Sequence, residues 1–153
     1  MNSGLASFNL AHPSGRILLA ESSVPAGFPS PAEDSAQGRI DLTEAFVLHP
    51  ACTFFQRATG RSMEGVGIFD GDYLVVDRIL EPVQGDVVVA VIENEFTVKL
   101  LHLRPGIMRL KAASPLYPDI IPKPGQTLEI RGVVTSSIRI HRDIRNVRTY
   151  RRK

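Results

Sequence analysis

The amino-acid sequence predicts a single, mainly β domain of the sandwich or barrel type. Its 153 residues are about one domain's worth of chain. Its composition, 43% hydrophobic and 22% charged, is typical of a globular protein and excludes a disordered or collagen-like chain. Beyond residue 50, short β-branched or aromatic segments alternate with turn-forming residues, which is the pattern of a β-rich fold.

The first 38 residues are expected to form an extended arm. Proline, glycine and serine recur at residues 12–15, 24–27 and 29–31 and interrupt any long periodic pattern. Val24 and Ala26 have the spacing of a signal-peptide cleavage site, but no Lys or Arg precedes Arg16. A secretory signal is therefore not expected.

A short helix should follow the arm. Asp41 and Glu44 have the spacing of a capping box, and residues 45–48 continue a helix of about two turns. The residue before a proline disfavours helical geometry, so His49 and Pro50 should end this helix.

Six strands are predicted in the rest of the chain. Turn signals at residues 70–72, 93–95, 104–106 and 123–125 separate them, and Asn94 marks a hairpin. The strands are expected at residues 53–58, 73–77, 86–92, 96–103, 107–111 and 128–140.

The chain lacks the features of several other protein classes. Its single cysteine, Cys52, excludes a disulfide framework or a multi-cysteine metal site and is typical of a reducing compartment. Apolar runs such as residues 87–92 stop far short of the roughly 18 residues of a membrane helix. We expect a soluble cytoplasmic protein with no membrane association.

Ser62 is a candidate nucleophile. It lies in a glycine-bearing turn after a predicted strand, where a loop on a rigid scaffold can display a reactive side chain. Serine is also a common turn former, so Ser62 by itself indicates little.

Lys99 is a more unusual residue because it interrupts an apolar strand. A lysine there either extends its amine to solvent or has a lowered pKa and serves as a base. A neutral lysine can take the proton of a serine hydroxyl without histidine or aspartate, so Ser62 and Lys99 together predict a Ser-Lys dyad.

Other candidate sites have weaker support. Asp70 and Asp72 flank a glycine without further ligands nearby, which favours a structural turn over a metal site. His49 and Cys52 are three residues apart, but Pro50 breaks any helix that would align them. The glycines match no nucleotide-binding loop, and neither a metal nor a cofactor is expected.

Three motifs, in order, resemble the LexA and UmuD family of self-cleaving proteins. Residues 60–77, GRSMEGVGIFDGDYLVVD, resemble its serine signature, and residues 95–105, EFTVKLLHLRP, resemble the segment around its general base. Ala26-Gly27 resembles the family's scissile bond, and residues 27–32, 39–42 and 49–50 are similar to the UmuD branch. The likeness covers roughly residues 24–138.

The resemblance implies a compact fold of twisted, partly open barrel-like sheets with an extended N-terminal arm. Ser62 would be the nucleophile, Lys99 the general base, and the Ala26-Gly27 bond the substrate. The backbone N–H groups of Ser62 and Arg61 would form the oxyanion hole. The implied domains are a cleavable arm (1–26), an autoprotease domain (27–141) and a basic tail (142–153).

The family resemblance also implies a function in the SOS response to DNA damage. A RecA filament on single-stranded DNA would stimulate self-cleavage, and the trimmed homodimer would assist a UmuC-like Y-family polymerase in error-prone translesion synthesis. The 26 residues before the Ala26-Gly27 bond are too few for a helix-turn-helix domain, so a polymerase accessory is favoured, and a LexA-type transcriptional regulator is the alternative. Two further alternatives are an interaction module that no longer cleaves itself and a protease that acts on other proteins.

The C-terminal residues depart from the UmuD pattern. Residues 139–153 have seven basic side chains and one acid, whereas residues 1–138 have 11 basic and 15 acidic ones. Arginines three residues apart drift by about 60° per step around an α-helix, so they define no single face. Either the tail is solvated, or it makes non-specific contacts to DNA phosphates. The arginines concerned are Arg142, Arg145, Arg148, Arg151 and Arg152.

Overall fold

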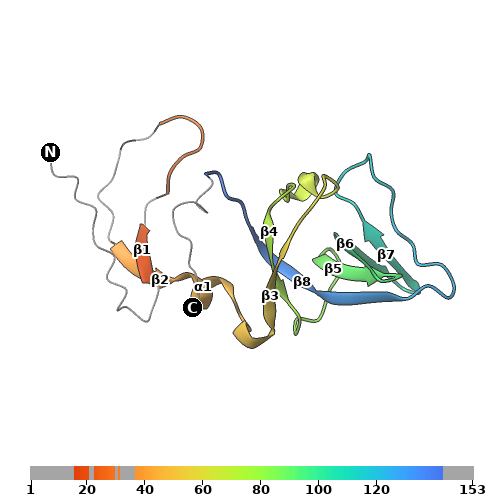
Figure 1. Ribbon diagram of the computed structural model, residues 1–153. Coiled ribbons are helices and arrows are strands. Elements are labelled where there is room, and N and C mark those ends of the chain that lie inside the picture. Colours follow the sequence, from red (N-terminus) through yellow and green to blue (C-terminus); the bar gives the residue numbers. More distant parts are fainter. Residues whose placement is uncertain (1–15, 21–22, 30, 32–36, 143–153) are drawn as a thin grey trace. The chain divides into compact units, whose positions relative to one another are not determined.

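The computed structural model describes residues 16–20, 23–29, 31 and 37–142 (Figure 1). Contacts within the chain divide it into two units, with the boundary between Val47 and Leu48. No helix in these described ranges is long and apolar enough to cross a membrane.

The first unit contains a pair of antiparallel strands, β1 (Arg16–Ala20) and β2 (Gln37–Asp41). Arg16 lies opposite Asp41, and the pairing continues to Ala20 opposite Gln37. β1 lies within the predicted arm and is extended, but its pairing with β2 was not predicted. An apolar run at residues 17–19 gives β1 the composition of a strand.

The predicted capping residue begins a short helix, α1 (Leu42–Phe46). The Asp41 carboxylate accepts hydrogen bonds from the backbone N–H groups of Thr43 (2.8 Å) and Glu44 (3.1 Å). This start confirms the prediction, but the expected length of two turns is wrong. Val47 already has extended dihedrals, and the β-branched residue favours that geometry.

The second unit is built on one six-stranded antiparallel sheet (Figure 1). All six predicted strands are confirmed, with ends that differ by at most two residues. Glu93 and Asn94 have positive φ and form the predicted hairpin turn between two of the strands. The strands are β3 (Thr53–Arg57), β4 (Tyr73–Asp77), β5 (Val87–Ile92), β6 (Glu95–Arg104), β7 (Ile107–Lys111) and β8 (Leu128–Ile138), and two short 3₁₀ turns are η1 (Pro50–Cys52) and η2 (Glu64–Val66).

The last strand in the chain, β8, lies in the middle of the sheet. The strand order is β3-β4-β8-β5-β6-β7, so β8 pairs with β4 on one side and β5 on the other. The register shifts at Val75/Val76 and at Val89/Ala90, and Gly132 of β8 lies between these irregularities. A Cβ at Gly132 would lie 2.7 Å from the Asp77 carbonyl oxygen, so the close strand approach requires glycine.

Hydrophobic side chains cover both faces of the sheet. Val89 belongs to one core cluster, with Met63 and Leu74, and its neighbour Val88 belongs to the other, with Leu101 and Leu110. Because successive strand residues point to opposite faces, β5 needs apolar residues at every position. This explains its uninterrupted VVVAVI sequence.

Candidate functional site

Ser62 lies on a loop between β3 and β4 whose base is closed by hydrogen bonds. The Ala58 N–H donates to the Asp72 carbonyl (2.8 Å), and the Gly71 N–H donates to the Ala58 carbonyl (2.8 Å). The Gly60 N–H donates to the Asp70 carboxylate (2.7 Å). Ser62 precedes Met63, the N-cap of η2, and the buried Met63 side chain belongs to the hydrophobic core cluster.

Ala113 fixes the serine turn from a segment that is distant in sequence. Its N–H donates to the Ser62 carbonyl (2.8 Å), and its own carbonyl accepts from the Gly65 N–H (3.1 Å). A Cβ at Gly65 would lie 2.0 Å from that carbonyl oxygen. A residue without a side chain is therefore required beside Ala113.

The structure brings Ser62 and Lys99 together. Lys99 lies on β6, and its Nζ is 2.9 Å from the Ser62 Oγ and 3.1 Å from the Val98 carbonyl oxygen. The strand holds the amine in a partly buried position, and burial lowers the pKa of Lys99 below its ordinary value, because it disfavours the ammonium form. The pair thus has the distance and the shift in proton affinity that a serine–base pair needs.

A cleft of about 190 Å³ opens at this pair. The end of β3 lines one side and the beginning of β6 the other, and no acidic side chain is among the described residues that line it. The side-chain oxygen of Gln56 is buried in this region and accepts no hydrogen bond from the described residues. The lining residues are Gln56, Arg57, Ala58, Thr59, Ser62, Leu74, Val89, Phe96, Thr97, Val98 and Lys99.

Most of these cleft residues were not predicted from the sequence, because only Ser62 and Lys99 have a residue type and a position that suggest chemistry. Gln56 lies in β3 and Thr59 follows the strand, and both line the cleft together with residues of β6 that are distant in sequence. Gly65 lies inside the serine motif, but only the contact with Ala113 explains why it is glycine.

Two backbone N–H groups adjoin the serine. Within the described part of the chain, neither the Arg61 N–H nor the Ser62 N–H donates a hydrogen bond. The Arg61 side chain is turned to Glu64, with 2.8 Å between Nε and the carboxylate. Both donors thus remain free to bind an oxygen atom.

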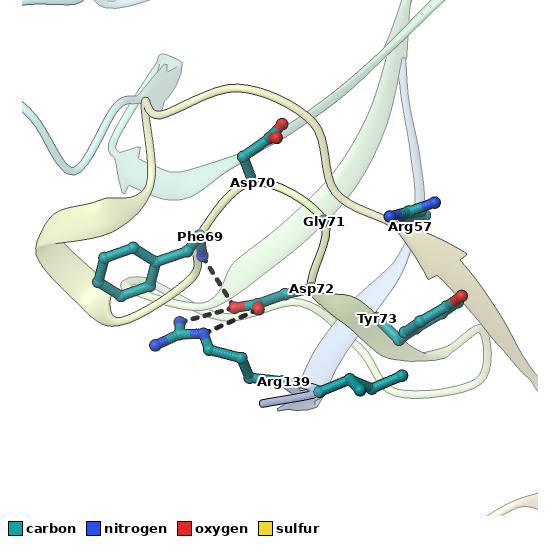
Figure 2. Close-up of a pocket in the computed structure, with 8 residues that line it drawn as sticks. Arg57, Phe69, Asp70, Gly71, Asp72, Tyr73 and Arg139 are labelled. Carbon is teal, nitrogen blue, oxygen red and sulfur yellow. Dashed lines mark hydrogen bonds and ion pairs between the residues drawn. The ribbon is translucent and has the colours of Figure 1, made fainter. Parts of the chain in front are cut away.

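Arg139 ties the segment after β8 to the loop that carries Ser62 (Figure 2). Its guanidinium donates to both oxygens of buried Asp72 (2.9 and 2.8 Å) and to the Gly67 carbonyl (2.8 Å). It also lies 3.8 Å from the centre of the Phe69 ring. The hydrogen bonds from Arg139 lower the pKa of Asp72 below its usual value, against the effect of burial.

Replacing Arg139 by alanine should therefore destabilise the protein, because it leaves the buried Asp72 carboxylate without its cation. Because the pKa of Asp72 is lower in the folded protein than in the unfolded chain, this stabilisation is present above about pH 4, near the pKa of an aspartate in the unfolded chain. It is lost as the pH falls through the lower pKa of Asp72 in the folded protein. The thermal midpoint of Arg139→Ala should lie below that of the wild type at neutral pH, and the difference should shrink in acid.

The matched control is Arg131→Ala, which removes an exposed ion pair with Glu129. Exposed pairs contribute little to stability, so its midpoint should stay close to that of the wild type. Equal midpoints for the wild type and Arg139→Ala at every pH would contradict the assigned role of the Arg139 contacts.

The other candidates have structural roles. The prediction that Asp70 and Asp72 form a turn is confirmed, since both carboxylates accept backbone N–H groups of their own loop. His49 contacts Asp77 rather than Cys52, with 2.6 Å between its Nδ1 and the carboxylate. Burial raises the pKa of Asp77, but hydrogen bonds from His49 and from two backbone N–H groups outweigh it and lower the pKa. Among the described residues, no three His, Cys, Asp or Glu side chains form a metal-binding group.

Ala26 and Gly27 lie at an exposed bend of the first unit. The next residue, Phe28, is 92% exposed. Of the arginines predicted to contact DNA, Arg142 is exposed at the end of the described chain, and Arg145, Arg148, Arg151 and Arg152 lie outside the described residues.

The sequence matches the family described as Peptidase S24-like over residues 18–135. It is 47% identical over 114 residues to Protein SamA of Salmonella typhimurium, covering 74% of this chain and 79% of that protein. It is 47% identical over 120 residues to Protein MucA of Escherichia coli, covering 77% of this chain and 81% of that protein. It is 39% identical over 118 residues to the LexA repressor of Dechloromonas aromatica, covering 76% of this chain and 58% of that protein.

Proposed function

The chain belongs to the Peptidase S24-like family, as its resemblance to LexA and UmuD predicted, and we propose on that premise that it is a self-cleaving serine endopeptidase. Its substrate is its own Ala26-Gly27 bond, and Ser62 and Lys99 are the catalytic residues. The observation that carries the proposal is the 2.9 Å distance between the Lys99 Nζ and the Ser62 Oγ in a partly buried cleft.

The first chemical step uses the neutral form of Lys99. Its Nζ takes the proton of the Ser62 hydroxyl while the Oγ attacks the carbonyl carbon of Ala26. The negative charge that develops on the carbonyl oxygen is stabilised by the backbone N–H groups of Ser62 and Arg61. Both donors have no acceptor among the described residues, which supports this assignment.

The second half of the reaction reverses the proton transfers. The protonated Lys99 gives its proton to the Gly27 nitrogen as the peptide bond breaks, leaving residues up to Ala26 as an ester on Ser62. Lys99 then removes a proton from water, and the resulting hydroxide attacks the Ala26 carbonyl carbon of the ester. As the bond from this carbon to the Ser62 Oγ breaks, the protonated Lys99 returns its proton to the Oγ, which restores the serine hydroxyl and releases the Ala26 carboxyl group. No metal or cofactor takes part in this proposal.

We propose further that the protein acts in the SOS response in the cytoplasm. A RecA filament on single-stranded DNA stimulates the cleavage, and the trimmed chain forms a homodimer that assists a UmuC-like Y-family polymerase in translesion synthesis. The identity to Protein SamA and Protein MucA over most of this chain supports placing it in the UmuD branch. The basic tail from Arg142 onward makes non-specific contacts to DNA phosphates.

Intact mass measurement after incubation tests the cleavage site. The purified chain, with RecA, single-stranded DNA and a nucleoside triphosphate, should yield residues 27–153, which are 127 residues. The fragment should weigh roughly 14 kDa, compared with 16.8 kDa for the whole chain. A cut elsewhere, or no cut, would contradict the proposal. Gly27→Val should slow the reaction without disturbing the fold, because a Cβ there meets no atom within 4 Å.

A further inference from the structure

The hairpin of β6 and β7 presents one face that consists largely of basic side chains. His102 pairs with Arg109, Arg104 pairs with Ile107, and Lys111 pairs with Leu100. Cross-strand partners point to the same face of a sheet, so the basic residues lie together. These four basic residues and Ile107 line a hollow of about 380 Å³. We call His102, Arg104, Arg109 and Lys111 the basic face.

The opposite face of the same hairpin is fixed in the protein interior. Leu101 and Leu110 are buried in a hydrophobic core cluster, and Leu103 packs against it. The hairpin therefore cannot turn its charged side inward. Figure 1 shows β6 and β7 side by side in the second unit, with β7 at the end of the sheet.

The charge of the basic face is not compensated by acids. Residues 96–118 contain four Lys or Arg residues and no Asp or Glu, although residues 1–138 as a whole have four more acids than bases. In the part of the chain that the structure describes, Arg104, Arg109 and Lys111 form no ion pair. The Arg109 Nε is shielded from solvent and donates no hydrogen bond to any described residue.

Such an arrangement has an energetic cost in the isolated protein. Like charges on neighbouring strands repel each other, and a shielded donor without an acceptor loses a hydrogen bond that water would otherwise supply. An anion on this face would remove both costs. Arginine is well suited to phosphate, because its planar guanidinium binds two oxygens at once.

We propose that the basic face binds the phosphate backbone of a nucleic acid, independently of its base sequence. Side chains two residues apart on a strand are about 6.8 Å apart, which is twice the 3.4 Å axial spacing of phosphates on one nucleic-acid strand. An acidic protein fits less well, since protein interfaces have apolar centres and the hollow offers only Ile107. This inference goes beyond the proposed self-cleavage and does not depend on it.

The test compares the salt dependence of binding for two double variants of the full chain. Arg104→Gln with Lys111→Gln changes two exposed residues of the basic face. Binding of a labelled single-stranded oligonucleotide is followed by fluorescence anisotropy between about 50 and 200 mM salt. The slope of log affinity against log salt should decrease in magnitude by about 1.4 for single strands, or by about 1.8 for a duplex. Repeating the measurement with a duplex of the same sequence shows which of the two forms binds more tightly.

The matched control removes the same charge from elsewhere. Arg78→Gln with Lys123→Gln also changes two exposed residues, and both lie outside the basic face. The slope of log affinity against log salt for this control variant should equal that of the wild type. If the slope decreases as much as in the basic-face variant, the effect comes from the net charge of the protein and the proposal is wrong. Displacement of the oligonucleotide by a poly-glutamate peptide of equal charge at equal concentration would also overturn it, in favour of an acidic protein.

A shortened chain that ends at Arg142 separates this face from the basic tail. The basic-face substitutions should reduce the slope by the same amount in the shortened chain as in the full chain. If the shortened chain does not bind the oligonucleotide, the tail alone is responsible and the proposal is wrong. If neutralising Arg104 and Lys111 causes only aggregation, with binding unchanged, the charges merely protect the edge strand β7 from pairing with other chains.

Discussion

Replacing Lys99 by methionine should stop self-cleavage and leave the protein folded. General-base catalysis typically contributes about 10²- to 10⁴-fold to a rate, so the variant should lose at least that much. Methionine has a similar length and no charge, and it removes the cost of burying an ammonium group. The burial that lowers the pKa of Lys99 therefore predicts a thermal midpoint equal to or above that of the wild type at neutral pH.

The same residue should determine how cleavage depends on pH. Only the neutral amine accepts the serine proton, and the neutral fraction increases as the pH rises toward the lowered pKa. The rate without RecA should therefore increase with pH and level off before about pH 10.4, the ordinary pKa of lysine. Measuring rates across this range, with circular dichroism at each pH, tests the expectation.

Two further variants distinguish the base from a merely structural lysine. Lys99→Arg keeps a positive charge but cannot lose its proton, so it should be inactive at every pH. Ser62→Ala should be equally inactive and retain the fold. A flat pH profile, or cleavage that persists in Lys99→Met, would refute the Ser-Lys dyad and direct attention to His49, His102 and Cys52.

Replacing Gly65 by alanine should greatly impair cleavage, although Gly65 takes no part in the chemistry. The added Cβ would lie 2.0 Å from the Ala113 carbonyl oxygen, so one of the two segments has to move. Ala113 also holds the Ser62 carbonyl, and any shift is transmitted to the nucleophile. Misplacement of a reacting group by about 1 Å can cost on the order of 10²-fold in rate.

The control for Gly65→Ala is Gly38→Ala. Gly38 lies in β2, where a Cβ meets no atom within 4 Å, so this substitution should leave the rate unchanged. Both variants are compared with the wild type by cleavage rate and by thermal midpoint. Wild-type cleavage by Gly65→Ala would show that the contact with Ala113 does not position Ser62.

Local sequence patterns were sufficient to predict the six strands of the second unit and to identify Ser62 and Lys99 as candidate site residues. The strands have apolar and β-branched residues bounded by glycine, proline or asparagine, and these signals act over a few residues. Lys99 was conspicuous because a charge in an apolar strand needs an explanation. The distance between Lys99 and Ser62 depends on the assembled sheet, and their motifs only indicated that they would meet.

Features that depend on distant partners could not be predicted. Ala113 has no side-chain chemistry that would indicate a role beside Ser62, and its contacts are made by the backbone. Arg139 was grouped with the other arginines near the C-terminus, but it binds Asp72 across the fold. The position of β8 in the middle of the sheet follows from long-range pairing, which residue composition does not encode.

The central position of β8 has a consequence during protein synthesis. Ser62 lies on the side of the sheet formed by β3 and β4, and Lys99 lies on the side formed by β5, β6 and β7. Among the described strands only β8 pairs with both sides, and the ribosome makes it last. A nascent or prematurely ended chain without residues 128–138 lacks the strand that joins the two sides. In such a chain the Ser62 loop keeps its backbone contacts with Ala113 but not the sheet pairing through β8, so we expect Ser62 and Lys99 to be held stably together only when the domain is complete.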